Sequence, residues 1–386
     1  MKKIKLMNKI AAVGTDIFDR KAYKVGEDID NPDAIMVRSA SLHEMPLGDN
    51  LLAIARAGAG VNNIPVDACT EKGIVVFNTP GANANGVKEL AVLALILASR
   101  DVCGGVEWVK TLQNDADIAK TVEKGKSAFV GCEIAGKKLG VIGLGAIGGM
   151  VANTAHSLGM KVVGCDPFIT VNAAWSLSRA IEKAAEYEEV YKTADYITLH
   201  VPATEKTKGM INKKTIAKMK DGVRIINLAR ADLVNAEDMK AALASGKVAA
   251  YVTDFPTPAT VGVKGIVNIP HLGASTVESE DNCAVMAAHE LDEFLRCGNI
   301  RNSVNFPAVS IPHTGAERIC LFHKNVPTML NQITAIISAE GINIENFSNG
   351  SRGEYAYTIV ELAEEAPADM TEKFKAIDGV IRVTAY

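Results

Sequence analysis

Short apolar segments alternate with helical segments along most of the chain. Segments typical of buried strands include AIMVRSA, LLAIARA and GIVVFNT near the start, and YITLHV, VRIINLA, AAYVTDF and GIVNIP farther along. Strands that alternate with helices predict parallel sheets with helices on both faces. We therefore predict an α/β fold with two doubly wound, Rossmann-like domains and a cleft between them, over residues 1–97 and 98–275.

Two stretches follow the second domain. Ser275 and Glu278 have the spacing of a capping box, so a helix is expected to begin near Ser275 and to end at Gly298. This helix, within residues 276–302, is expected to complete the first domain. Residues 303–316 combine proline and glycine with polar residues, which is typical of a linker.

The C-terminal region, residues 317–386, has a different pattern. Its apolar and polar positions predict strand, helix, strand, strand, helix and strand, in that order. This order is typical of a ferredoxin-like βαββαβ domain, in which two helices cover one face of a small antiparallel sheet.

A glycine turn lies between an apolar strand and a helix in the second domain. Asp166 follows the last of its three glycines by eighteen residues. In dinucleotide sites the first glycine makes the tight turn, the second admits the pyrophosphate, and the helix N-terminus offers free N–H groups. An acid at this distance accepts hydrogen bonds from the adenosine ribose and favours NAD over NADP. The predicted NAD site comprises Gly143, Gly145, Ala146, Ile147, Gly148 and Asp166.

Composition narrows the class of protein. A net charge of −4 argues against a nucleic-acid partner and an anionic membrane. No apolar run reaches the roughly 18 residues that span a bilayer. The seven cysteines have no paired spacing, which suits reduced thiols. We expect a cytoplasmic protein without a metal site.

Two candidate catalytic residues follow predicted strands. Arg230 ends IINLAR and His271 follows GIVNIP. The carboxyl ends of parallel strands are where ligands bind, an arginine fork suits a carboxylate, and a histidine carries a proton near neutral pH. Oxidation of a 2-hydroxy acid by NAD requires both functions. Taken singly, each residue is more often structural.

Several motifs resemble the NAD-dependent D-2-hydroxyacid dehydrogenases over nearly the whole chain. They are RAGAGVNNI, VVFNTPGANANGVKELA, GLGAIG, LHVPATEKTKGMI, INLARADLVN and PHLGAST. The resemblance implies hydride transfer from 3-phospho-D-glycerate to NAD, giving 3-phosphohydroxypyruvate. It makes Arg230 the carboxylate ligand, His271 the acid/base and Asp254 a contact of the nicotinamide amide.

The same resemblance assigns the substrate cleft. Asn83 matches a position that lines the cleft, Arg38 matches a phosphate contact, and Arg56 is expected nearby. Solvated or ion-paired surface arginines are an equally open interpretation. Two other functions stay open: a different 2-hydroxyacid dehydrogenase, such as a hydroxypyruvate or glyoxylate reductase, and a non-catalytic sensor of NAD or amino acids.

The chain departs from the family pattern twice. Ala146 stands where the family usually has an arginine that contacts the pyrophosphate. The family also carries a glutamate that hydrogen-bonds the catalytic histidine, whereas no acid lies between Asp254 and His271 here. Thr257 and Pro258 are the nearest equivalents in sequence. Either Asp254 serves two roles, or His271 works without a partner carboxylate.

The C-terminal region resembles an ACT domain, a module that binds amino acids at paired interfaces. By this resemblance His323, Asn325 and Asn343 hold L-serine as an effector, and the chain self-associates as a dimer or tetramer. Amide side chains suit this ligand because they offer both donors and acceptors. The alternative is that these residues only cap a helix and strand ends.

Overall fold

The computed structural model describes residues 1–314 and 316–386. Residue 315, within the predicted linker, lies outside the described residues. The chain divides into two compact units: Met1–Ala82 with Glu280–Tyr386, and Asn83–Ser279. The first boundary therefore falls at residue 82, and the prediction of residue 97 is wrong.

The first unit begins with a five-stranded parallel sheet. Its strands are β1 (Lys2–Met7), β2 (Tyr23–Gly26), β3 (Ala34–Val37), β4 (Ala53–Arg56) and β5 (Val75–Asn78). Their spatial order is β2-β1-β3-β4-β5. The strand order reverses between β1 and β3, and ligands of open α/β sheets bind at the carboxyl ends beside such a reversal.

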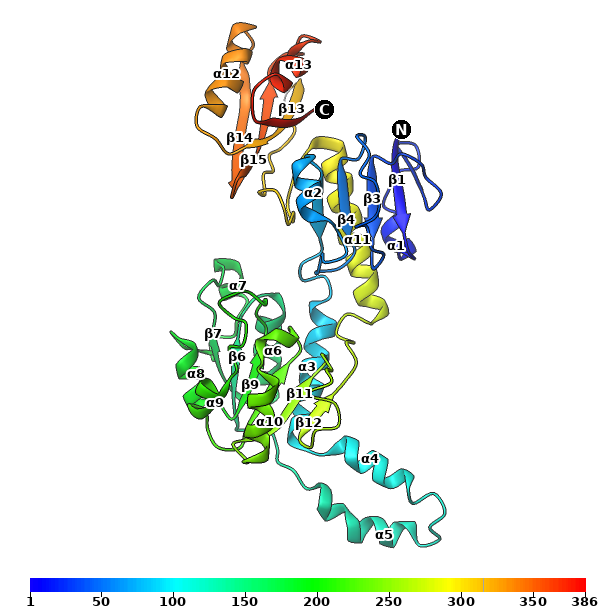
Figure 1. Ribbon diagram of the computed structural model, residues 1–386, viewed down its shortest axis with the longest axis vertical. Helices are drawn as coiled ribbons and strands as arrows, with labels where there is room; N and C mark the ends of the chain where they lie inside the picture. Colours follow the sequence, from blue (N-terminus) through cyan, green and yellow to red (C-terminus); the bar gives the residue numbers. More distant parts are fainter. Residues whose placement is uncertain (315) are drawn as a thin grey trace. The chain divides into compact units, whose positions relative to one another are not determined.

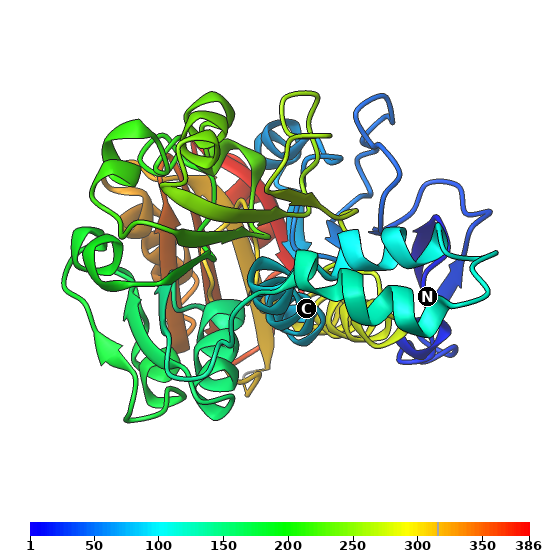
Figure 2. The ribbon, with the colours of Figure 1, turned by 90° about the horizontal axis from the view of Figure 1, so that it is seen from below.

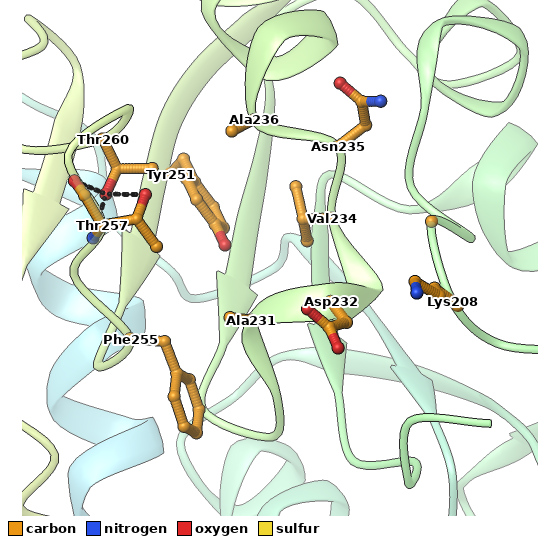
Figure 3. Close-up of a pocket in the computed structure, with 11 residues that line it drawn as sticks. Lys208, Ala231, Asp232, Val234, Asn235, Ala236, Tyr251, Phe255, Thr257 and Thr260 are labelled. Carbon is orange, nitrogen blue, oxygen red and sulfur yellow. Dashed lines mark hydrogen bonds between the residues drawn. The ribbon is translucent and has the colours of Figure 1, made fainter.

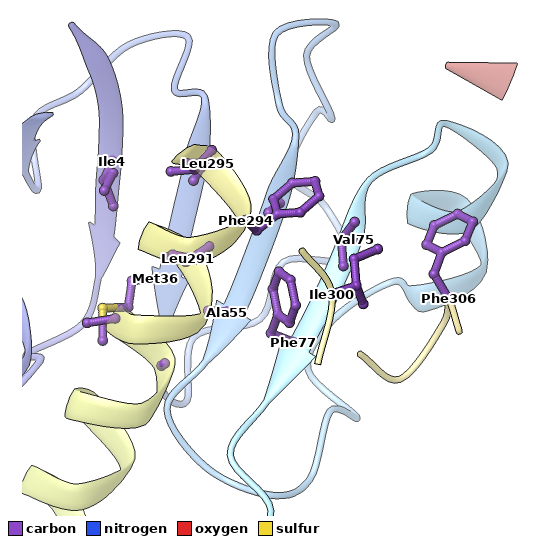
Figure 4. Close-up of a cluster of buried hydrophobic side chains, with 14 of the residues drawn as sticks. Ile4, Met36, Ala55, Val75, Phe77, Leu291, Phe294, Leu295, Ile300 and Phe306 are labelled. Atoms are coloured by element: carbon purple, nitrogen blue, oxygen red, sulfur yellow. The ribbon is translucent and has the colours of Figure 1, made fainter. Parts of the chain in front are cut away.

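Helices cover both faces of this sheet. The faces are covered by α1 (Ala12–Thr15) and α11 (Val277–Cys297) on one side and α2 (Val66–Glu71) on the other. Figure 4 shows Leu291 and Phe294 of α11 lying over buried sheet residues such as Met36 and Phe77. The start of α11 differs from the prediction, because Thr276 rather than Ser275 caps it: the Thr276 hydroxyl accepts the Ser279 N–H at 3.1 Å.

The predicted linker is wrong for residues 303–309, which belong to the core. The Asn305 amide group donates to the Ile74 carbonyl at 2.9 Å, and its oxygen accepts the Val76 N–H at 2.9 Å. Phe306 is fully buried, with its ring centroid 4.8 Å from that of Phe322. The polar composition thus reflects side chains that satisfy buried backbone groups.

The C-terminal region has the predicted βαββαβ order. Its elements are β13 (Glu317–Lys324), α12 (Met329–Ala339), β14 (Ile344–Arg352), β15 (Tyr355–Leu362), α13 (Met370–Lys375) and β16 (Val380–Ala385). They form an antiparallel sheet in the order β14-β15-β13-β16, and α12 and α13 pack on one face.

The other face of this sheet is not free. Phe322 and Tyr357 belong to the same buried cluster as Phe77 and Phe294 of the first sheet and α11. The C-terminal sheet and the first sheet therefore share one hydrophobic core, which explains why both fall in one compact unit.

The second unit contains a seven-stranded parallel sheet. Its strands are β6 (Lys138–Ile142), β7 (Lys161–Cys165), β8 (Glu182–Lys183), β9 (Tyr196–Leu199), β10 (Val223–Asn227), β11 (Val248–Thr253) and β12 (Ile266–Asn268). The order β12-β11-β10-β9-β6-β7-β8 contains the dinucleotide-binding arrangement, with its reversal between β6 and β9.

Two layers of helices enclose this sheet (Figure 1). One face is covered by α3 (Ala84–Ser99) and α6 (Ala146–Ser157), and the other by α8 (Tyr187–Thr193), α9 (Lys213–Ala217) and α10 (Ala236–Ala244). Ala91 and Leu95 of α3 are buried in one cluster with Val141 and Val151. This packing places α3 in the second unit and explains the misplaced boundary.

A helical hairpin extends from the second unit. It consists of α4 (Val102–Lys110), α5 (Ile118–Gly125) and the short helix η1 (Lys126–Phe129), and α4 and α5 lie side by side in both views (Figures 1 and 2). Neither α4 nor α5 has a buried residue, although Val106 and Val109 are apolar and exposed. No helix in the described parts of the chain is long and apolar enough to cross a membrane.

Candidate active site

The glycine turn between β6 and α6 leaves space beside a helix N-terminus. Gly143 has φ +89°, and a Cβ there would lie 2.5 Å from the His200 carbonyl oxygen. A Cβ on Gly148 would lie 1.9 Å from the Gly143 carbonyl oxygen, whereas one on Gly145 would meet nothing within 4 Å. The outer glycines are thus required by the fold, and the open side of Gly145 fits a pyrophosphate.

Asp166 is held beside this turn by backbone groups. One carboxylate oxygen accepts the Leu144 N–H at 2.8 Å, and the other accepts the Phe168 N–H at 2.9 Å. Both oxygens retain capacity for further donors, as a ribose contact requires. Ala146 and Ile147 begin α6, directly after Gly145.

A pocket that the sequence did not reveal borders Asp166. It has a volume of about 680 Å³ and includes Trp175 of α7 (Val171–Trp175) and Arg179. These residues match no motif, and the pocket depends on how α7 lies against β7 and β8.

A neutral histidine supports the turn from β9. Burial lowers the pKa of His200 to about 4, and its Nε2 lies 3.0 Å from the Thr198 hydroxyl. The backbone of His200 occupies the space that a side chain on Gly143 would need. An uncharged imidazole at this point adds no positive charge near the expected phosphates.

Asn227, which the sequence reasoning missed, fixes the backbone around Arg230. It is fully buried at the end of β10, and its side-chain nitrogen donates to the Arg230 carbonyl at 2.8 Å. Its oxygen accepts from the Ala229 and Arg230 N–H groups at 3.2 and 3.4 Å. Among the described residues, the exposed Arg230 side chain donates only to the Ala229 carbonyl, at 2.6 Å, so most of its donors are available to a ligand.

Asp254 is a buried acid directly after β11. Its side chain is 1% exposed, and among the described residues its Oδ1 has no hydrogen-bond partner. Burial raises the pKa of Asp254, while the positive charges of His271 and Arg230 oppose this increase. The three predicted catalytic residues are therefore close enough to interact electrostatically.

His271 is exposed and lies against an aromatic ring. The centroids of the His271 and Phe255 rings are 4.8 Å apart, with their planes at 53°. No carboxylate hydrogen-bonds His271 in the described parts of the chain. The positive charge of His271 acts to lower the pKa of Asp254, which precedes Phe255 in the chain.

Thr257, the residue nearest in sequence to the missing glutamate, forms hydrogen bonds within its own turn. The Thr257 hydroxyl lies 3.2 Å from the Thr260 hydroxyl, which donates to the Asn268 side-chain oxygen at 3.0 Å. Both threonines line a pocket of about 340 Å³ with Phe255 and Tyr251 (Figure 3). Thr257 thus does not replace the glutamate as a partner of His271.

The predicted substrate residues are divided between the units. Arg38 and Arg56 lie at the carboxyl ends of β3 and β4 in the first unit, whereas Asn83 precedes α3 in the second. The Arg38 guanidinium pairs with Glu280 at 2.7 Å, and Arg56 Nε donates to the Arg38 carbonyl at 3.1 Å. The Asn83 side chain makes no capping hydrogen bond, so its amide is not committed to the helix.

The three predicted effector residues do not converge within one chain. His323 is buried, and its ring nitrogens lie 2.8 Å from the Lys324 carbonyl and the Thr358 hydroxyl. His323 of β13 pairs with Ala356 of β15. Ile344 of β14, which follows Asn343, pairs with Leu362, at the other end of β15. At roughly 3.3 Å per residue, Asn343 lies about 20 Å along the sheet from His323 and the adjacent Asn325.

Comparisons with known proteins identify the family. Residues 93–273 match the family described as D-isomer specific 2-hydroxyacid dehydrogenase, NAD binding domain. A protein of Haemophilus influenzae is 32% identical over 344 residues, which cover 86% of this chain and 80% of the relative. The chain therefore belongs to the D-isomer-specific 2-hydroxyacid dehydrogenases, and it is an NAD-dependent enzyme.

Two sequence relatives within this family carry the same name. The Haemophilus influenzae protein is a D-3-phosphoglycerate dehydrogenase, as is a Bacillus subtilis protein that is 33% identical over 305 residues. That match covers 76% of this chain but only 55% of the Bacillus subtilis protein. An NAD⁺-bound 3-phosphoglycerate dehydrogenase of Entamoeba histolytica has a TM-score of 0.61 and 28% identity, covering 79% of this chain and 98% of that one.

Proposed function

We propose that this enzyme oxidises 3-phospho-D-glycerate to 3-phosphohydroxypyruvate with NAD⁺. The observation that carries the proposal is the grouping of Arg230, Asp254 and His271 at the carboxyl ends of the sheet that holds the glycine turn. The names of the sequence relatives support the choice of substrate.

Each residue has a role that follows from its surroundings. Arg230 binds the substrate carboxylate, because its backbone is fixed by Asn227 while its fork stays exposed. His271 removes the hydroxyl proton, and its contact with Phe255 holds the ring. Bound NAD⁺ supplies the hydride acceptor.

Asp254 takes two roles in this proposal. Its unpartnered Oδ1 accepts a hydrogen bond from the nicotinamide amide, and it is the acid that interacts electrostatically with His271. A buried acid without a partner suits both roles, because the missing donor comes from outside the protein.

The substrate phosphate is proposed to bind Arg38 and Arg56. Asn83 is proposed to line the substrate cleft. The support is chemical: two neighbouring arginines at the carboxyl ends of β3 and β4 suit a dianion. The pocket beside Asp166 is proposed to receive the adenosine half of NAD.

The test is NADH formation with 3-phospho-D-glycerate, using D-glycerate as the unphosphorylated control. We expect turnover that strongly favours the phosphorylated acid. Equal turnover of both acids would contradict the phosphate assignment, and turnover of another 2-hydroxy acid alone would replace the substrate while leaving the reaction class.

We further propose that the C-terminal region is an ACT domain that binds L-serine between two copies of the chain. The separation of Asn343 from His323 and Asn325 supports this arrangement, because one copy cannot bring all three to one small ligand. Titration calorimetry with L-serine, beside light scattering, tests it. Heat from a dimer or larger assembly is expected, and serine binding by a monomer would contradict the shared site.

The α4–α5 hairpin supports the same self-association, because Val106, Val109 and Ile118 are apolar and exposed. A cytoplasmic location is also proposed, on the strength of seven free cysteines.

A further inference from the structure

Two arginines and one glutamate meet at the carboxyl end of the first sheet. Arg38 follows β3 directly, and Arg56 ends β4 in register with Val37. Because the strand order reverses between β1 and β3, Arg38 lies beside the point where open α/β sheets bind ligands. Two arginines at this position suit an anionic ligand.

The third member of this group comes from far along the chain. Glu280 of α11 places one carboxylate oxygen 2.7 Å from a terminal nitrogen of Arg38. The side chains are 38% and 42% exposed, and a single nitrogen and a single oxygen make the contact. Such a contact is weaker than the two-pronged pairing of arginine with a phosphate, which carries nearly two charges and three acceptor oxygens.

We propose that Glu280 is an internal competitor for the phosphate site. Its carboxylate pairs with Arg38 while the site is empty, and the phosphate of the ligand displaces it. The inference rests on the proposed function in taking Arg38 as the phosphate ligand. Two anions repel each other at one guanidinium group, so binding becomes an exchange and the affinity falls below that of a free Arg38. Recapture of Arg38 by Glu280 then assists the departure of a phosphorylated product.

The test compares Glu280→Gln with the parent enzyme as full-length protein. Glutamine keeps the side-chain length and an oxygen, and removes only the charge. Titration calorimetry with inorganic phosphate is expected to give a dissociation constant about fivefold lower, in line with the loss of one exposed ion pair. KM for 3-phospho-D-glycerate falls with it, whereas KM for D-glycerate stays constant and kcat does not rise.

A matched control lies two residues away. Glu278 is exposed on the same turn of α11 and forms no ion pair with any described residue, so Glu278→Gln makes the same change in net charge without touching Arg38. Its effect on phosphate binding is expected to be small and to vanish in salt. Equal tightening in both variants would show a general charge effect, and weaker phosphate binding in Glu280→Gln would show that Glu280 positions Arg38. Either result overturns the proposal.

Calorimetry separates this inference from the proposed function. If Glu280→Gln binds phosphate more tightly but 3-phospho-D-glycerate is not turned over, Glu280 is a competitor for Arg38 and the proposed substrate is wrong. If 3-phospho-D-glycerate is turned over but Glu280→Gln leaves phosphate binding unchanged, the proposed substrate is supported and Glu280 is not a competitor.

Discussion

The chain buries ionisable groups in two contrasting ways. In the C-terminal region Arg318 and Glu361 are both 0% exposed and lie 2.6 Å apart. Arg318 also donates to three backbone carbonyls, and Glu361 accepts from Thr314 and Asn346. At the carboxyl end of β11, Asp254 is also buried but has an oxygen without a partner among the described residues.

The difference separates a structural pair from a proposed functional group. Arg318 links β13 to the end of α11 and to residues 311–312, so its donors are already engaged in hydrogen bonds within the protein. Asp254 keeps an acceptor oxygen that no described residue satisfies. Four other buried side-chain atoms of the described residues also lack a partner, so the unsatisfied oxygen alone does not distinguish Asp254. Its electrostatic interaction with Arg230 and His271 is what makes it a candidate functional group.

The largest effect is expected on the functional side, from His271→Asn. Asparagine keeps a polar group of similar size but cannot take the hydroxyl proton, so kcat should fall about 10³-fold. The midpoint of thermal unfolding should stay close to that of the parent, because His271 is exposed. Stopped-flow NADH formation and calorimetric unfolding measure the two quantities, and a large loss of stability would blur the proposed contrast.

Arg318→Met should lower the stability of the fold, in contrast to His271→Asn, which lowers turnover. It leaves Glu361 charged, buried and partly unpaired, which costs about 3–5 kcal/mol of unfolding free energy. Urea unfolding measures this cost. The double variant Arg318→Met, Glu361→Leu should recover most of it, because the penalty comes from the abandoned charge. No recovery would mean that the lost bonds to the backbone carbonyls dominate.

Asp254→Asn tests whether a group can be costly to the fold and useful to the reaction. Turnover should fall about 10- to 100-fold, because the variant loses the charge that interacts with His271 and changes the contact with the nicotinamide amide. Stability near neutral pH should not fall, since burial disfavours the charged acid. Unchanged turnover would remove Asp254 from the catalytic group.

A third buried acid, Glu290, is expected to make the stability of the protein depend on pH. Burial raises the pKa of Glu290 in α11 to about 8, and its Oε1 accepts from Asn302 at 2.7 Å. The folded protein therefore holds a proton that the unfolded chain releases near pH 4.5, so stability falls as pH rises from about 4.5 to about 8. Glu290→Gln should flatten this slope and gain on the order of 2 kcal/mol at pH 8. An unchanged slope would show that Glu290 is ionised in the folded protein.

The local patterns were sufficient to predict most elements of the fold. The glycine turn, the βαββαβ order and the helix that ends before Gly298 all depend on a few neighbouring residues, and each is confirmed. The predictions failed where packing decides. The boundary moved because α3 is buried against α6, and part of the supposed linker is core because Asn305 satisfies the backbone of β5.

The sequence by itself determined the dinucleotide turn, the residues at strand ends and the class of chemistry, because these follow from spacing and from the properties of single side chains. Only the tertiary structure decided which charges meet. Arg38 and Glu280 are 242 residues apart in the chain, Arg318 and Glu361 are 43 apart, and Asp254 shows its missing partner only once buried. Pairing and burial are properties of the folded chain, and no local pattern contains them.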